Sequence, residues 1–91
     1  MAFTKKQINT AWNNAKKIRG KDPAKIRQDP YGNEMHIDSY GKTSAKGWEV
    51  DHIKPSARGG SDATRNLQAL NAKLNRSKGD SLVKKSRHTK R

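Results

Sequence analysis

A carboxylate and an imidazole stand side by side in this sequence, and two carboxamides follow them: Asp51, His52, Asn66 and Asn75. Carboxylate and amide oxygens suit a hard divalent cation such as Mg²⁺ or Mn²⁺, which keeps its other coordination positions for water and phosphate. A histidine can be uncharged near neutral pH and can then take a proton from water as a general base. These residue types therefore suit hydrolysis of a phosphodiester, which requires an activated water and positive charge beside the phosphate.

Each of these four residues has an ordinary structural explanation when it is taken alone. Asp51 could be a surface carboxylate and His52 a packed or exposed histidine, and asparagines commonly occupy loops and helix caps. The pattern becomes specific through the residues that accompany it: Pro55, Gly59-Gly60, Leu67 and Lys78-Gly79-Asp80. Together these residues favour a nuclease site over four unrelated polar positions.

A strong excess of positive charge favours a polyanionic partner. The chain of 91 residues has 21 Lys and Arg against 8 Asp and Glu, which gives a formal net charge of +13. Such an excess attracts nucleic acid, and the release of counterions makes the affinity depend on salt. An acidic membrane would attract it too, but no stretch is apolar enough to span or lie in a bilayer, so we expect nucleic acid and no membrane as the partner.

The residue composition also limits how the fold can be stabilised. The chain has no cysteine, which excludes disulfide bonds and thiolate zinc sites, and with only 3 histidines we expect no structural zinc. A chain of this length forms one small domain with a thin core. The N-terminus is basic but lacks the apolar run of a secretory signal, so we expect a cytoplasmic location.

The spacing of apolar residues predicts an N-terminal helix over residues 4–19. Thr4 and Gln7 form a capping box at its start, and Gly20 suits its end. The apolar stripe recurs at helical spacing: Ile8, Ala11, Trp12, Ala15 and Ile18. The opposite face is basic and is either simply solvated or in contact with phosphate: Lys5, Lys6, Lys16 and Lys17.

Short patterns further along the chain predict strands, a loop and a second helix. Apolar residues alternate over residues 35–37 and 48–50, which predicts two short strands. Residues 53–65 contain Pro and Gly-Gly and are expected to form a loop. The apolar run at residues 67–70 fits a strand or a helix, and Asn71 can cap a helix that runs toward Gly79.

Four stretches between Trp48 and Asp80 match one known pattern: Val50-Asp51-His52-Ile53-x-Pro55, Gly59-Gly60-Ser61-Asp62, Asn66-Leu67-Gln68-x-Leu70 and Asn75-x-x-Lys78-Gly79-Asp80. Through them the chain resembles the HNH endonuclease family. The resemblance implies an α+β fold with a ββα-metal core. It implies a strand that ends at His52, a long loop, a second strand over residues 66–70 and a helix over residues 71–80. The apolar pattern alone leaves the second of these strands undecided.

The same resemblance implies a role for each residue of the motif. His52 matches the family's general base and Asp51 matches a metal ligand, while Asn66 matches the middle Asn, which orients the imidazole. Asn75 stands where many members have the last His, a second metal ligand. Many members also carry paired cysteines that bind structural zinc, and in their absence we expect the N-terminal helix and Trp12 to help hold the core.

A strand imposes one condition on this interpretation. Consecutive side chains of a strand point to opposite faces, so Asp51 and His52 can reach one site only if the strand ends or bends there. Basic residues near the motif are candidates for contact with DNA phosphates, or else are solvated charges: Lys54, Arg58, Arg76 and Lys78. His36 is expected to be structural or exposed rather than catalytic, and Trp48 to pack in the core.

These observations predict one HNH nuclease domain over residues 1–80, with the ββα-metal motif at 47–80 and a basic, flexible tail at 81–91. We expect a Mg²⁺- or Mn²⁺-dependent DNA endonuclease that nicks one strand as a monomer. Cutting both strands would need a homodimer, a second visit or a targeting protein. The alternative is a basic protein that binds nucleic acid on the same scaffold without cutting it.

Overall fold

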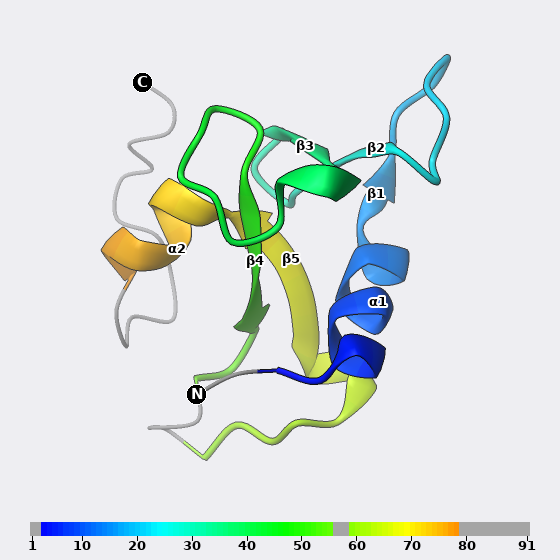
Figure 1. The fold of residues 1–91 in the computed structure, drawn as a ribbon. Coiled ribbons are helices and arrows are strands. Elements are labelled where there is room, and N and C mark those ends of the chain that lie inside the picture. Colours follow the sequence, from blue (N-terminus) through cyan, green and yellow to red (C-terminus); the bar gives the residue numbers. More distant parts are fainter. Residues whose placement is uncertain (1–2, 56–58, 79–91) are drawn as a thin grey trace.

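The computed structural model describes residues 3–55 and 59–78, which fold into two small antiparallel sheets flanked by helices (Figure 1). The elements follow in this order: α1 (Lys5–Asn14), β1 (Lys16–Lys17), β2 (Ile26–Gln28), β3 (Glu34–His36), a 3₁₀ turn (Ile37–Ser39), β4 (Trp48–His52), a second 3₁₀ turn (Thr64–Asn66), β5 (Leu67–Asn71) and α2 (Ala72–Lys78). The predicted α+β class is confirmed. Arg58 and the predicted tail at 81–91 lie outside the described residues.

The strands β4 and β5 form an antiparallel hairpin that leads directly into α2. The pairing is regular from Trp48 opposite Asn71 to His52 opposite Leu67. The first strand ends at His52, as the family resemblance implies. The second strand begins at Leu67, one residue later than predicted. Two strands and a helix therefore follow one another in the order of a ββα core.

The helix α1 begins as predicted but ends earlier. Thr4 and Gln7 form the capping box, in which the backbone N–H of Gln7 donates to the Thr4 hydroxyl at 3.1 Å. The helix stops at Asn14, so the predicted helix over residues 4–19 is wrong over residues 15–19. The cause is long-range, because the Arg27 guanidinium captures the carbonyl oxygens of Asn13 and Ala15 at 3.1 Å each. Residues 16–17 then pair with β2 instead of continuing the helix.

The face of the hairpin that turns toward α1 carries the aromatic core. Trp48 is fully buried, and its ring lies 5.0 Å from that of Trp12 on α1. Each indole N–H is satisfied by a carbonyl, Trp12 on Pro23 and Trp48 on His36, both at 3.0 Å. Burying a polar group is costly without such a partner, so these bonds let both rings enter the core. Trp48 packs, as predicted, and Trp12 packs on it.

A buried carboxylate ties the N-terminal sheet to the hairpin. Asp29, with 1 % of its surface exposed, accepts the backbone N–H of Asn71 at 3.0 Å where β5 meets α2. It also accepts the backbone N–H groups of Tyr31 and Asn33, at 2.9 Å each. Asn71 in turn caps α2, as predicted, by accepting the N–H of Leu74 at 3.0 Å. One carboxylate thus links the β2–β3 turn to the start of α2.

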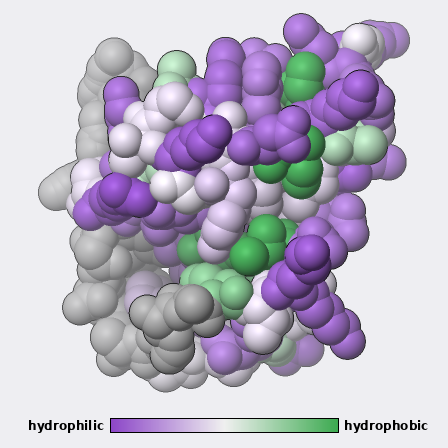
Figure 2. Space-filling view, in the orientation of Figure 1, coloured by the Kyte–Doolittle hydropathy of each residue, from purple (hydrophilic) through white to green (hydrophobic). Residues whose placement is uncertain are grey.

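The surface agrees with the basic, polar composition. Hydrophilic residues cover most of the face shown in Figure 2, between small apolar areas. Within residues 3–55 and 59–78, no helix is long and apolar enough to cross a membrane.

Replacing Glu34 with Gln tests a charge cluster on the N-terminal sheet. The Lys46 ammonium lies 2.9 Å from the Glu34 carboxylate, and the Lys21 ammonium lies 3.7 Å from it. The hydrogen bond from Lys46 holds the pKa of Glu34 below its ordinary value of 4.5. A lowered folded-state pKa stabilises the fold above the ordinary value, and this stabilisation is lost as the pH falls through the lowered pKa.

We therefore expect Glu34→Gln to lower the melting temperature near neutral pH, with the difference from the parent shrinking toward zero as the pH falls through the lowered pKa of Glu34. Thermal unfolding followed by circular dichroism measures this. Asp38→Asn, which removes an exposed carboxylate close by, is the matched control. A difference from the parent that persists unchanged in acid would contradict the role given to the charge cluster.

Candidate active site

The pleat of β4 divides the predicted site residues between two faces. The ladder stays regular through Asp51 opposite Gln68 and His52 opposite Leu67. Because side chains alternate along a strand, Asp51 shares a face with Glu49, and His52 lies on the other face with Val50. The first of these faces turns toward α2 and the second toward α1. The strand does end at His52, but it does not bend before it.

Asp51 is positioned by its cross-strand neighbour. The Gln68 side-chain amide donates to the Asp51 carboxylate at 2.8 Å, and the two residues are directly opposite in the ladder. Directly paired residues lie on the same face with their Cβ atoms close together, which is why the amide reaches the carboxylate. Gln68 therefore fixes the orientation of the carboxylate that is predicted to hold a metal.

Asn75 lies on α2 against the same face of the hairpin. Its amide nitrogen donates to the Glu49 carboxylate at 3.0 Å, so its amide oxygen is the atom left for other ligands. Arg76 donates to the other oxygen of Glu49 through two nitrogens. The bond from Arg76, with a smaller contribution from Asn75, holds the pKa of Glu49 below its ordinary range. Arg76, predicted to contact DNA, is thus engaged by Glu49 here.

His52 is held at the end of the strand by a residue of the following loop. Its Nε2 atom lies 2.6 Å from a carboxylate oxygen of Asp62. An ionised carboxylate only accepts hydrogen bonds, so Nε2 is the donor in this contact. The imidazole also packs against Phe3, with ring centroids 5.5 Å apart. The His52 side chain is 19 % exposed and that of Asp62 is 68 % exposed, so the contact sits at the surface.

Asn66 closes the base of the loop that carries Asp62. Its amide oxygen accepts the Lys54 N–H at 2.8 Å, and its amide nitrogen donates to the carbonyls of Lys54 at 3.1 Å and Ser61 at 2.7 Å. One side chain thereby joins both ends of the loop. Gly60 allows this close approach, because a Cβ there would lie 1.7 Å from the Lys54 carbonyl oxygen. In this structure Asn66 contacts the loop backbone, and Asp62 contacts the imidazole.

An open pocket of about 210 Å³ lies at the outer edge of β4, and it is lined by Phe3, Tyr40, Glu49, Val50 and Asn75. It draws on both faces of the strand, since Val50 and Glu49 point opposite ways. Phe3 both lines this pocket and contacts the His52 ring. Burial raises the pKa of Tyr40, so its hydroxyl stays protonated. The outer edge of β4 is therefore where groups from the two faces approach a common space.

The residues fit a hard divalent ion through oxygen ligands only. Asp51 offers a carboxylate, and the amide of Asn75 binds Glu49 through its nitrogen, which turns its oxygen away from that carboxylate. In the described part of the chain, no three His, Asp or Glu side chains form a group that could hold a metal by themselves. Water and phosphate oxygens would have to complete the coordination, as is usual for Mg²⁺.

The structure describes the two lysines that were predicted to contact DNA to different extents. Lys54 is engaged through its backbone, and its side chain is exposed. Lys78 is the last described residue of α2. Four residues for which the sequence predicted no role contact the site residues: Phe3, Glu49, Asp62 and Gln68. The alternation of β4 could have placed Glu49 beside Asp51, whereas nothing in the sequence pairs Phe3 or Asp62 with His52.

Replacing Asn66 with Asp tests whether this side chain holds the loop. The aspartate keeps the acceptor for Lys54 but loses both donated bonds, and we expect a loss of about 1 kcal/mol in local stability. Hydrogen exchange of the Gly60 amide, which binds the Pro55 carbonyl at 2.9 Å, reports on loop opening. Exchange should accelerate there and stay unchanged within the β4–β5 ladder. Asn9→Asp on the exposed face of α1 is the control. Unaltered Gly60 exchange would show that Asn66 does not hold the loop.

Comparison with known proteins identifies the family. A family model described as HNH endonuclease matches residues 32–81. No curated protein and no solved structure matches the chain. HNH nucleases act on DNA, and members of the family generally use a divalent metal ion. The matched segment covers more than half of the 91 residues and includes β4, the following loop, β5 and α2, so the chain belongs to the HNH endonuclease family.

Proposed function

We propose that the protein is a metal-dependent DNA endonuclease that hydrolyses phosphodiester bonds with a water activated by His52. The contact between Asp62 and His52 Nε2 is the observation that carries this proposal. A general base must be oriented toward the water that it activates, and a carboxylate bound at Nε2 orients the imidazole. Family membership supports the nuclease activity and DNA as the substrate class.

Asp51 and Asn75 would hold the divalent ion, with Mg²⁺ or Mn²⁺ suiting their oxygen atoms best. When bound, the ion supplies positive charge beside the phosphate and the departing oxygen. Gln68 keeps the Asp51 carboxylate oriented through its 2.8 Å hydrogen bond. Glu49 and Arg76 hold the α2 end of the site, because Glu49 accepts bonds from both Asn75 and Arg76.

In the proposed reaction, His52 takes a proton from water. The water oxygen bonds to phosphorus, and the bond from phosphorus to the 3′ oxygen breaks. The electron pair of that bond leaves with the 3′ oxygen, which is then protonated from solvent. The products carry a 5′ phosphate and a 3′ hydroxyl. The Asp62 carboxylate stabilises the imidazolium that forms, as an opposite charge within hydrogen-bond distance does.

A chain with one such site cuts one strand in each event. We therefore propose that the monomer nicks DNA, and that cutting both strands requires a second copy, a second visit or a targeting partner. The net charge of +13 supports association with DNA of any sequence, because phosphate contacts attract and position a protein without reading bases. We propose a cytoplasmic location for this activity.

The second candidate is a protein that binds nucleic acid without cutting it. The regular pleat through Asp51 and His52 favours it, because the two side chains leave the strand on opposite faces. On this view the basic surface binds DNA and the motif residues serve only the fold. Binding without cleavage in every divalent metal tested would support this candidate against the nuclease.

Relaxation of supercoiled plasmid in Mg²⁺ or Mn²⁺, with and without EDTA, tests the proposed function. We expect nicked circles with either metal and none with EDTA. His52→Ala should lower the rate by at least about 100-fold, the usual contribution of a general base. His36→Ala is the matched control, because His36 lies on β3 outside the candidate site. Cleavage by His52→Ala at the parent rate would rule out the assigned role.

A further inference from the structure

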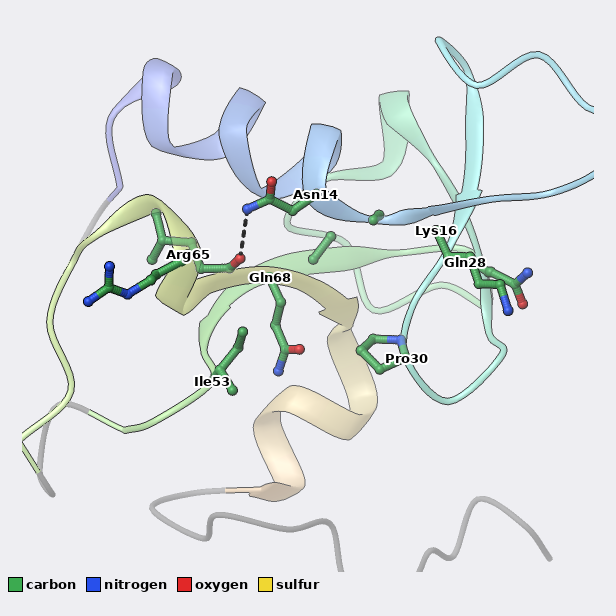
Figure 3. A pocket seen from close by; sticks show the side chains of 10 residues that line it. Asn14, Lys16, Gln28, Pro30, Ile53, Arg65 and Gln68 are labelled. Atoms are coloured by element: carbon green, nitrogen blue, oxygen red, sulfur yellow. Dashed lines mark hydrogen bonds between the residues drawn. The ribbon is translucent and has the colours of Figure 1, made fainter.

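A groove of about 370 Å³ runs along the outer edge of β5, where the N-terminal part of the chain meets the hairpin (Figure 3). Figure 3 shows Arg65 at one end and Lys16 with Gln28 at the other, while Gln68 and Ile53 lie between them. The groove is on the opposite edge of the hairpin from the pocket beside β4. A ligand long enough to extend beyond the candidate active site could therefore contact this groove as a second surface.

The charges and polar groups of this groove suit an anion. Lys16 and Arg65 both line it, and neither has an ion-pair partner among residues 3–55 and 59–78. No Asp or Glu is among its lining residues. Gln28 and Gln68 add side-chain amides, whose N–H groups donate to phosphate oxygens as readily as to other acceptors. Apolar atoms between the polar ends match the sugar parts of a nucleic-acid backbone.

The walls of the groove are fixed in the free protein. The Asn14 amide donates to the carbonyls of Thr64 at 3.0 Å and Leu67 at 3.2 Å, which fastens the end of α1 to the start of β5. Lys16 pairs with Gln28 in the β1–β2 ladder, so these two residues share one edge of the groove. A preformed site loses less conformational entropy when a ligand binds.

The groove also adjoins the candidate catalytic residues. Gln68, which lines it, donates the 2.8 Å bond to Asp51. Ile53, which also lines it, directly follows His52 and is 48 % exposed. A nucleic-acid strand that fills the groove would therefore reach the end of the hairpin at which Asp51 and His52 lie. Lys16 and Gln28 come from the part of the chain before residue 32, outside the segment matched by the family model.

We propose that this groove binds the sugar–phosphate backbone of DNA beside the bond that is cut, with Lys16 and Arg65 contacting phosphates. The inference rests on the proposed function for its substrate class. On this proposal, the part of the chain before residue 32 binds the substrate in addition to packing on the hairpin.

Fluorescence anisotropy with a short labelled DNA duplex in EDTA, over a series of salt concentrations, tests the groove. The variant is Lys16→Gln with Arg65→Gln. The control is Lys25→Gln with Lys42→Gln, which removes the same charge from exposed lysines outside the groove. Each lost phosphate contact should lower the slope of log affinity against log salt by about 1, so the groove variant should lose about 2. The control should keep nearly the parent slope.

Equal slopes for the groove variant and the control would overturn the proposal, and so would a change seen only with duplex RNA. Circular dichroism checks that both variants remain folded, and the single variants at positions 16 and 65 should each lose about half of the effect. The groove and the proposed function can fail separately. If the protein never nicks plasmid but the groove variant shows the slope change, the proposed DNA-binding role of the groove stands and the proposed nuclease function fails. If the protein nicks plasmid and the groove variant shows no slope change, the proposed role of the groove fails.

Discussion

The pleat of a β-strand sends consecutive side chains to opposite faces, and Asp51 and His52 are consecutive on β4. The arrangement of the site depends on this constraint. The carboxylate lies on the face toward α2, with Gln68 beside it on β5 and Asn75 on α2. The imidazole lies on the face toward α1, where Phe3 and Asp62 of the returning loop contact it. The two can act together only where the faces meet, at the outer edge or the end of the strand. The pocket beside β4 is lined from both faces through Glu49 and Val50, and Asp51 and His52 are not among its lining residues.

The rest of the fold keeps that edge in place without cysteine. Trp12 packs on Trp48 across the interface of α1 with the hairpin, and Asp29 links the β2–β3 turn to the start of α2. A core this small tolerates little loss, since the stability of a short domain is a small difference between large terms. The N-terminal residues that lie before the family match thus supply packing, loop anchoring through Asn14, and one wall of the basic groove.

The ββα unit could be predicted because the motif and the glycine pair carry a resemblance to a known family; local signals alone supply the Asn71 cap and leave β5 undecided between strand and helix. The register of the β4–β5 ladder places Gln68 opposite Asp51. This register could not be derived from the sequence before the two strands were known to pair. The end of α1 was not predictable in this way, because Arg27, distant in sequence, captures its last carbonyls. The Asp62 contact with His52 was beyond reach for the same reason, since a long loop has no periodicity that fixes where its carboxylate lies. The strands β1 and β2 are too short to leave a pattern.

Paramagnetic Mn²⁺ added to isotope-labelled protein and followed by NMR tests most directly whether Asp51, His52 and Asn75 surround one metal ion. Broadening by Mn²⁺ falls steeply with distance, so it locates the ion without any reaction. We expect the earliest losses at the Asn75 side-chain amide, the Asp51 backbone and the His52 ring, and their removal in Asp51→Ala. Broadening centred instead on Glu34 of β3 or on Asp38 in the 3₁₀ turn after it would contradict a metal site at the end of β4.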